Sequence, residues 1–572
     1  FPTTPRLLLQ VYHNPGYLII YDIFANNLAT KWVNSSCSNL LPHEIIIITV
    51  ITIFFTFNLY NFIFENDKSF FERVKVGFFY HAKRLPIIRS IVKQQMESVL
   101  NEVSAEKLFP LKSGMHYLNK LPIRGKTHLQ IDRVVEEYLS LDDVDWKNGN
   151  VSGTVYGGDA GLTDVITKVY KKFAWSNPLH PEVFPGLRKM EAEIVRISCE
   201  LFNGNPQTSC GSVTIGGTES ILLACKTYRD WAYGKGIQKP EIVCPVSVHA
   251  AFEKAAHYFR MKLVHVPVDS VTRKVNVSAM KNAISRNTCM LVGSTPPFPH
   301  GVLDPITEIA ALGMKYNIPV HVDACLGGFL LPFMSDAGFP VPPFDFSVPG
   351  VTSISADTHK YGYSPKGSSV VLYSDKKWIH YQYFVSPDWQ GGIYATPMFA
   401  GSRSGAIIAA CWATMMYFGR EGYVNRTKKI ITTARYIEQG LRKIEYIYVL
   451  GKPEMSVVAL GSLDFDVFRL STELVKRGWN LNNLQFPASI HICCTMPHTH
   501  PGVADRLLQD IRESVDIIMS DPKAKATGAG AIYGMAQSIP DRSIVTEISH
   551  GFIDALYDTG SKSVANGNGY AK

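Results

Sequence analysis

Lys360 is the residue of this 572-residue chain whose setting best suits covalent chemistry. It follows the apolar segment Ser353–Ala356 and stands in the sequence Asp-Thr-His359-Lys360-Tyr-Gly-Tyr363. A lysine at the end of a buried strand contributes little to solubility. An amine in that position can instead form a Schiff base with an aldehyde cofactor. The pattern therefore predicts an amine nucleophile at position 360.

Two glycine-containing turns have the composition of phosphate sites. Gly216-Gly217-Thr218 follows a short apolar segment and opens a helix, whose first N–H groups and positive dipole end favour an anion. Gly401-Ser402 stands at the start of a second apolar helix. A helix cap made by Thr218, or a plain loop at Gly401, would use the same residues. Both alternatives stay open on this pattern alone.

Asp323 and His249 could complete a site for a flat, charged cofactor. Asp323 ends the apolar segment that begins at His321. A buried acid is costly unless it faces a positive charge, and a protonated pyridine nitrogen would supply one. His249 opens a helix and could stack on a ring; helix capping is the alternative for both residues, and a salt bridge is a further one for Asp323. An aldehyde, a phosphate, a pyridinium and a flat ring are the groups of pyridoxal phosphate (PLP), so the residues together predict a PLP site.

Strands and helices alternate through the middle of the chain. Helices of about 10–15 residues between short buried strands indicate a mainly parallel sheet with helical cover, hence an α/β fold. After Arg420 longer helices with short strands predict a smaller C-terminal α+β domain, while residues 111–180 carry loop signals. The predicted strands are Glu241–Val246, Leu263–Val268, Met290–Ser294, Pro319–Ala324, Ser353–Ala356 and Ser368–Tyr373. The predicted helices are Thr218–Tyr233, Ala250–Phe259, Ser278–Ser285, Ile306–Tyr316, Arg426–Ile444 and Val503–Met519.

Composition limits the class of protein. The chain is 46% hydrophobic and 19% charged, with a net charge of +8, which suits a folded protein of more than one domain. No Lys/Arg block of the kind that binds nucleic acid is present in the sequence. The ten cysteines form no CxxC pair and no metal-ligand spacing, so we expect reduced thiols and no metal.

Residues 45–64 are 20 consecutive residues without a charge, the length that spans a bilayer core as a helix. A buried helix of a soluble protein could look similar. Only Arg6 and Lys31 precede this segment, whereas seven Lys and Arg fall between Lys68 and Lys93. The positive-inside rule then places the C-terminal part in the cytosol and residues 1–44, with a possible glycosylation site at Asn34, in the lumen. We expect a single-pass protein of the endoplasmic reticulum membrane.

These observations predict six segments. They are 1–44, a lumenal N-terminal segment; 45–64, a transmembrane helix; 65–165, a juxtamembrane linker and N-terminal arm; 166–420, a large PLP-binding domain; 421–545, a small C-terminal domain; and 546–572, a C-terminal tail.

Longer motifs resemble one enzyme family. They resemble the sphingosine-1-phosphate lyase family, in the group II decarboxylase branch of fold type I (aspartate aminotransferase-like) PLP enzymes, and the resemblance covers nearly the whole chain. The motifs are Ser152-Gly-Thr-Val-Tyr156, Phe173-Ala-Trp-Ser-Asn177-Pro-Leu-His180-Pro181, Gly216–Ser220, His321–Gly328, Ser353–Lys366 and Asp388-Trp-Gln-Gly-Gly392.

The resemblance implies a role for each matching residue at the cofactor. Lys360 would form the Schiff base, Asp323 would pair with the pyridine nitrogen, and His249 would stack on the ring. The cofactor phosphate would lie near Gly217, Thr218 and His359. The family's active sites are shared across a homodimer, so Gly401 and Ser402 would reach the phosphate of the partner subunit.

The resemblance also implies a substrate and a reaction. A phosphorylated sphingoid base such as sphingosine 1-phosphate would be cleaved between C2 and C3, in a retro-aldol sense, to a long-chain aldehyde and phosphoethanolamine. The substrate phosphate and reacting end would meet Tyr156, Asn177, His180 and Lys366, although the tyrosine could simply pack and Lys366 could be surface charge. Lys366, Tyr156, His180 or the substrate's own phosphate could be the base.

Two other functions compete with this interpretation. An amino-acid decarboxylase of the same fold would need a cation for the substrate carboxylate and would have no use for a membrane anchor. A membrane scaffold without catalysis would have no reason to keep both Lys360 and Asp323.

Overall fold

The computed structural model describes residues 40–64, 104–526 and 542–560, together with positions 78, 90, 101 and 534. The chain divides into two compact units, residues 1–78 and 79–572. In the first unit, α4 (Pro42–Phe64) contains the whole segment predicted to be a helix at 45–64. Among the described residues, no helix combines the length and apolarity that crossing a membrane requires. The helix is thus confirmed, and the membrane span has no structural support. Asn34 lies outside the described residues.

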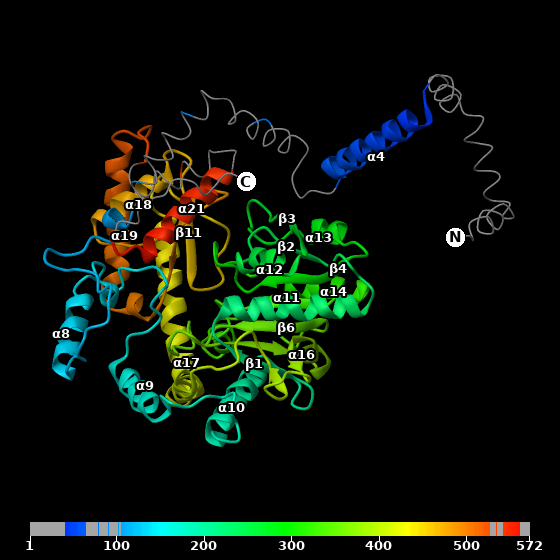
Figure 1. Ribbon diagram of the computed structural model, residues 1–572. Coiled ribbons are helices and arrows are strands. Elements are labelled where there is room, and N and C mark those ends of the chain that lie inside the picture. The colour runs from blue at the N-terminus through cyan, green and yellow to red at the C-terminus, as the bar shows by residue number, and fades with distance from the viewer. Residues whose placement is uncertain are drawn as a thin grey trace. The chain divides into compact units, whose positions relative to one another are not determined.

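A seven-stranded sheet forms the centre of the second unit, in the order β1-β7-β6-β5-β4-β2-β3 (Figure 1). The neighbours from β6 to β3 are parallel, and β7 runs antiparallel to both β6 and β1. The predicted, mainly parallel sheet is confirmed. Its strands are β1 (Cys210–Thr214), β2 (Glu241–Pro245), β3 (Lys262–Val266), β4 (Thr288–Ser294), β5 (Val320–Asp323), β6 (Val351–Ala356) and β7 (Ser369–Tyr373).

Helices cover both faces of this sheet. Successive strand residues point to opposite faces, so Val243 belongs to one apolar cluster while Ile242 and Cys244 belong to another. Burial on both sides explains the nearly continuous apolar strands. One face carries α11 (Gly217–Gly234), α12 (Ala251–Phe259) and α16 (Lys376–Gln382), and the other carries α10 (Pro185–Leu201), α13 (Val277–Ala283), α14 (Ile306–Tyr316) and α15 (Leu331–Met334).

A four-stranded antiparallel sheet lies in the C-terminal part, in the order β10-β11-β13-β12. Helices packed on this sheet complete the smaller α+β arrangement that the sequence predicted. Its elements are β10 (Tyr448–Val449), β11 (Val457–Gly461), β12 (Asn482–Leu484), β13 (Ser489–Cys493), α18 (Val467–Lys476), η3 (Met496–Thr499) and α19 (Val503–Met519); α21 (Arg542–Tyr557) follows, and β8 (Phe384–Ser386) pairs with β9 (Tyr394–Thr396) elsewhere.

One long element, α17 (Gly405–Leu441), contacts both parts of the unit (Figure 1). It packs on α10 near the large sheet and on α19 and β11 near the small one. Gly419 breaks the helix with φ 54° and ψ −176°, a conformation that glycine adopts without steric cost. The sequence predicted an apolar helix after the Gly401-Ser402 turn and a separate long helix at Arg426–Ile444, and the structure joins the two across the kink at Gly419.

The loop prediction for residues 111–180 was partly wrong. The segment contains α8 (His128–Leu139), η2 (Trp146–Asn148) and α9 (Ala160–Phe173), while α7 (Ala105–Leu108) precedes it. Side-chain caps stabilise the two longer helices: Thr127 and Gln130 form a capping box on α8, and Asp159 accepts a hydrogen bond from the Leu162 N–H at 2.8 Å. The glycine- and proline-rich stretches 152–158 and 177–181 are loops as predicted.

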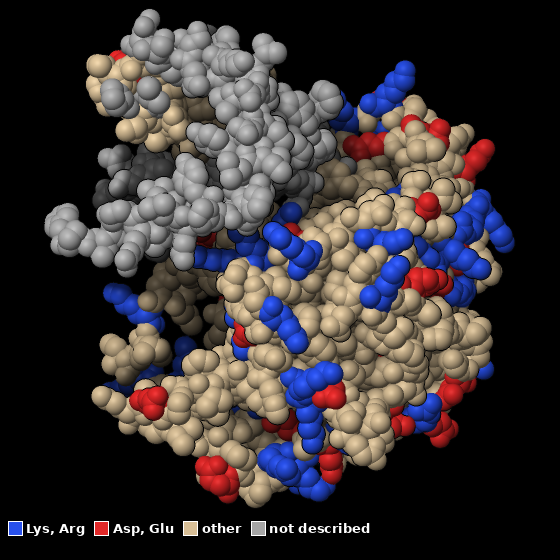
Figure 2. Space-filling view, turned by 90° about the vertical axis from the view of Figure 1, so that its right-hand side faces the viewer, with Lys and Arg blue, Asp and Glu red and all other residues tan. Residues whose placement is uncertain are grey.

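The surface charges are mixed. On the face shown in Figure 2, Lys and Arg side chains are scattered among Asp and Glu. Every cysteine in the described part of the chain is a free thiol, and eight of those nine are buried.

Candidate active site

Lys360 lies in a tight turn that follows β6. The Tyr363 N–H donates to the Lys360 carbonyl at 3.0 Å, and Tyr363 has a φ of 58°. A β-carbon added at Gly362 would lie 2.3 Å from the Thr358 carbonyl oxygen, so the turn can close only with glycine there. The parallel strands end at this edge of the sheet, which is where ligands bind in α/β folds.

Asp357 holds the amine of Lys360. Its Oδ2 lies 3.0 Å from Lys360 Nζ, and the Asp357 side chain is 2% exposed. Burial, the largest single effect, would lower the pKa of Lys360, but the charge and hydrogen bond of Asp357 together with Tyr156 and Cys325 outweigh it and hold that pKa above the usual range. Burial likewise opposes ionisation of Asp357, but the charges of Lys360 and His359, with the hydrogen bonds from Ser369 and Lys360, together outweigh it and lower the pKa of the acid. The sequence analysis gave Asp357 no role, although an acid three residues before a buried lysine was the available signal.

A chain of hydroxyl groups orients Asp357. Ser369 Oγ donates to Asp357 Oδ1 at 2.6 Å, and Ser220 Oγ lies 2.9 Å from Ser369 Oγ. Thr214 Oγ1 follows at 2.7 Å from Ser220. These residues are buried and come from β1, α11 and β7. The position of Lys360 therefore depends on three elements besides its own strand.

A cavity of about 660 Å³ opens above Lys360. A β-carbon at Gly217 would lie 2.7 Å from both carboxylate oxygens of Asp357 and 2.8 Å from Cys325 Sγ, so only glycine lets the start of α11 approach the turn this closely. Among the residues that line the cavity are Gly216, Gly217, Thr218, His249, Cys325, Asp357, His359, Lys360 and Lys366.

Asp323 ends β5 as predicted and is 5% exposed. Its Oδ1 accepts hydrogen bonds from the Cys325 N–H at 3.0 Å and from Ser355 Oγ at 3.4 Å. Within the described residues it has no ion-pair partner. A buried carboxylate without a cation beside it is costly, and a protonated pyridine nitrogen would relieve that cost.

His249 and His359 take different positions at the cavity. The ring of His249 lines the cavity, and its Nδ1 accepts a hydrogen bond from the Ala251 N–H at 3.1 Å. The capping and stacking interpretations of this histidine are thus compatible. His359 Nδ1 lies 2.5 Å from the Ser368 carbonyl, which fixes the ring, and burial lowers its pKa. The Lys360 amine, the His249 ring and the glycine turn line one cavity and fit PLP, whereas Asp323 is not among its lining residues and lies behind Cys325, to whose N–H it is bonded.

Comparison with known proteins agrees with this geometry. Residues 158–461 match the pyridoxal-dependent decarboxylase conserved domain. Sphingosine-1-phosphate lyase 1 of Rattus norvegicus is 53% identical over 559 residues, 98% of this chain and 97% of the relative. The sphingosine-1-phosphate lyase of Drosophila melanogaster is 50% identical over 93% of this chain and 97% of its own length. The chain belongs to the sphingosine-1-phosphate lyase family. Its cofactor is PLP.

Solved structures extend the comparison. The sphingosine-1-phosphate lyase of Burkholderia pseudomallei has a TM-score of 0.72 and 37% identity, covering 79% of this chain and 100% of that one. A glutamate decarboxylase of Lactobacillus brevis has a TM-score of 0.61 at 21% identity, covering 72% of this chain and 97% of that one, which shows a common fold.

Two of the residues assigned to the substrate in this lyase-family chain lie near Lys360. The Lys366 ammonium is 4.9 Å from the centre of the Tyr156 ring, and that ring packs edge-on against Tyr361 at 4.8 Å. Burial raises the pKa of Tyr156, so its hydroxyl keeps its proton. Burial, and then the charge of Lys360, lower the pKa of Lys366.

The other predicted residues form a separate group. Asn177 Nδ2 donates to Ser402 Oγ at 3.0 Å, and Asn177 Oδ1 accepts from the Arg403 N–H at 3.3 Å. His180 is exposed and pairs with Glu182 at 3.4 Å. None of Asn177, His180, Gly401 and Ser402 lines the described cavity around Lys360. Their roles at the substrate and at the partner's cofactor remain predictions.

Proposed function

We propose that this chain is a sphingosine-1-phosphate lyase. It cleaves the C2–C3 bond of sphingosine 1-phosphate and related phosphorylated sphingoid bases, giving a long-chain aldehyde and phosphoethanolamine. The observation that carries the proposal is the Lys360–Asp357 pair at 3.0 Å in the cavity, on a chain 53% identical to a lyase of this name.

When bound, PLP supplies an aldehyde for the amine and a ring that accepts the electrons of the broken bond. The residues of the chain supply the rest. Lys360 provides the amine, and the Asp357 carboxylate stabilises the protonated form of that amine. Asp323, the buried carboxylate at the end of β5, would hold the protonated pyridine nitrogen. Gly217 leaves room at the start of α11, whose N–H groups favour a phosphate.

A retro-aldol cleavage needs a base for the C3 hydroxyl. The base must lose its own proton readily near neutral pH. Lys366 meets this condition better than Tyr156, because the pKa of Lys366 is lowered and that of Tyr156 is raised. Of these two residues, the directions favour Lys366 as the acceptor of the hydroxyl proton, beside the Tyr156 ring at 4.9 Å; His180 and the substrate's own phosphate stay alternatives.

The decarboxylase alternative is less well supported. The relatives at 50% and 53% identity carry the name of the lyase, whereas the similarity to glutamate decarboxylase is one of fold. The test is an assay of purified enzyme for long-chain aldehyde and for CO₂, with sphingosine 1-phosphate and with glutamate. We expect aldehyde from the first substrate, and none from Lys360→Ala. CO₂ from an amino acid without aldehyde from the lipid would reject the proposal.

The active unit is a homodimer with shared active sites. In support, Leu121 and Ile123 are 94% and 104% exposed, and α8 leaves apolar side chains such as Leu129 exposed. An apolar surface of this kind is typical of a contact with another chain. Asn177 and Ser402 lie together outside the Lys360 cavity, where a partner's active site could use them. Sedimentation should give twice the mass of one chain.

The chain is anchored to the endoplasmic reticulum membrane by one N-terminal helix, with its catalytic part in the cytosol. The uncharged residues 45–64 and the excess of Lys and Arg after them support this. An anchor of this kind would keep the enzyme where a substrate with a long apolar chain partitions.

A further inference from the structure

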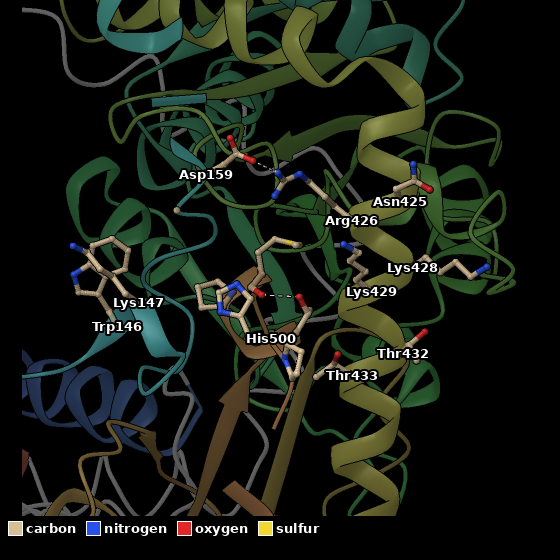
Figure 3. Close-up of a pocket in the computed structure, with 15 residues that line it drawn as sticks. Trp146, Lys147, Asp159, Asn425, Arg426, Lys428, Lys429, Thr432, Thr433 and His500 are labelled. Carbon is tan, nitrogen blue, oxygen red and sulfur yellow. Dashed lines mark hydrogen bonds and ion pairs between the residues drawn. The ribbon is translucent and has the colours of Figure 1, made fainter. Parts of the chain in front are cut away.

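A second cavity, of about 1250 Å³, lies beside α17 and shares no lining residue with the cavity around Lys360. We call it the α17 cavity. Figure 3 shows Trp146 and Lys147 of η2 on one side and the second half of α17 on the other, with His500 between them. Thr433 adds a hydroxyl group to its wall.

The lining of the α17 cavity has an excess of positive charge. Lys147, Arg426, Lys428 and Lys429 belong to it, against one acid, Asp159. Asp159 is already neutralised, since its Oδ2 pairs with Arg426 at 2.9 Å and its Oδ1 caps α9. Within the described residues, no acid lies in ion-pair distance of the three lysines.

Two of these cations share one face of α17. Arg426 and Lys429 are three residues apart on α17, and both extend toward the cavity in Figure 3, whereas Lys428 points away from it. Like charges on one helix face destabilise the helix. Arg426 is already paired with Asp159, so a bound anion would mainly offset the charge of Lys429, which has no acid within ion-pair distance in the described residues. Ammonium and guanidinium groups with nearby hydroxyls are the groups that bind phosphate in proteins.

The cavity wall reaches the catalytic turn. The Arg426 guanidinium lies 5.1 Å from the centre of the Tyr363 ring, and the Tyr363 N–H bonds to the carbonyl of Lys360. Gly158, two residues after Tyr156, also lines the α17 cavity. A ligand that moved Arg426 would therefore act on the turn that holds Lys360.

We propose that the α17 cavity is a binding site for a phosphate-bearing anion, separate from the cofactor and substrate sites. Lys147, Arg426 and Lys429 bind the phosphate charge. The phosphate belongs to a soluble molecule or to a lipid headgroup, two sources with the same recognition chemistry. The proposal does not depend on the reaction, because binding is measured without turnover.

The test is calorimetric titration of the full-chain holoenzyme, in neutral detergent, with pyrophosphate. Bound PLP keeps the cofactor's phosphate site filled. The test variant is Lys147→Ala/Lys429→Ala. The matched control is Lys281→Ala/Lys315→Ala, which removes two exposed lysines of α13 and α14. A second variant, Lys147→Arg/Lys429→Arg, keeps the charge. A parallel titration uses dihexanoyl phosphatidic acid as a monomer, to represent a lipid headgroup.

We expect at least tenfold weaker binding in the Ala variant, with the control and the Arg variant unchanged. Loss confined to pyrophosphate identifies a soluble ligand, and loss confined to the phosphatidic acid identifies a lipid headgroup. Equal affinities in the Ala variant and the wild type would place the anion elsewhere, for example at Lys366, and overturn the proposal. Failure of the wild type to bind either probe would overturn it as well.

Discussion

The Asp357 carboxylate lies 3.0 Å from the Lys360 amine, and both belong to the turn that follows β6. This pair, and not one with Asp323, sets the protonation of the lysine. Within the described residues, Asp323 has no cation at ion-pair distance.

Asp357→Asn should lower the pKa of Lys360, because the burial of the amine is then no longer opposed by a negative charge. More of the amine is then neutral at a given pH. The rate at which apoenzyme recombines with PLP increases with pH, and in the variant this increase should begin at a lower pH than in the wild type. Breaking a buried pair also costs about 3–5 kcal/mol of stability. Reconstitution followed by absorbance from pH 6 to 10 checks this. Asp375→Asn, at the cap of α16, is the control; an unchanged pH profile for Asp357→Asn would contradict the assignment.

Asp323→Asn should lose most of the activity and release PLP more readily. A neutral amide cannot hold the pyridine nitrogen in its protonated form. Activity and the cofactor content after dialysis are the measurements. Asp464→Asn, at an exposed position, should keep both. Near-normal activity in Asp323→Asn would show that another residue faces the pyridine nitrogen.

Gly217→Ala should weaken PLP binding severely, since its β-carbon would lie 2.7 Å from the Asp357 carboxylate. The neighbouring glycine offers a matched control. A β-carbon at Gly216 would meet nothing within 4 Å, and its φ of 165° is extended backbone. Equilibrium titration with PLP should give at least a tenfold loss for Gly217→Ala and a small change for Gly216→Ala. Equal losses in the two variants would show that the close approach of α11 to the turn does not determine the affinity for PLP.

Acid should destabilise the fold well before the carboxylates titrate. Burial lowers the pKa of four histidines to about 4 each: His300, His321, His491 and His498. The unfolded chain binds these protons below a pKa of about 6.5, while the folded chain does not. Stability is therefore complete above pH 6.5 and falls as the pH drops toward 4, by about 1.4 kcal/mol per histidine at pH 5.5.

Thermal unfolding at pH 7.5 and pH 5.5 measures this loss. His491→Gln should reduce the loss of stability between pH 7.5 and pH 5.5 by about the contribution of one histidine. His380→Gln, at an exposed position, should leave that loss unchanged. A melting temperature that is equal at the two pH values would contradict the burial of these rings.

Removal of residues 1–64 should give a more soluble protein that still forms a dimer and cleaves detergent-dispersed substrate, because the residues assigned to the site all follow position 150. Protease added to sealed microsomes should digest the C-terminal part, and Asn150, Asn276 and Asn425 should carry no glycan. Protection of the C-terminal part from protease would reverse the proposed topology.

Local patterns were enough to predict much of this protein. Apolar strands separated by helices indicated the parallel sheet, and α14 and α19 have the predicted bounds. Lys360, Asp323 and Gly217 were recognisable because each is a polar or glycine residue at the end of an apolar strand. Such signals are local, since burial of a strand and the opening of a helix depend on neighbouring residues.

Only the tertiary structure decided which of these residues meet. It supports the Asp357 carboxylate, which pairs directly with Lys360, by a hydroxyl chain whose members lie on three elements. It places Asn177 against Ser402, 225 positions away, and gathers lysines of η2 and α17 around a second cavity. Contacts between distant segments depend on how the sheet and α17 pack. The energy of that packing comes from many segments together, so no single stretch of sequence determines these contacts.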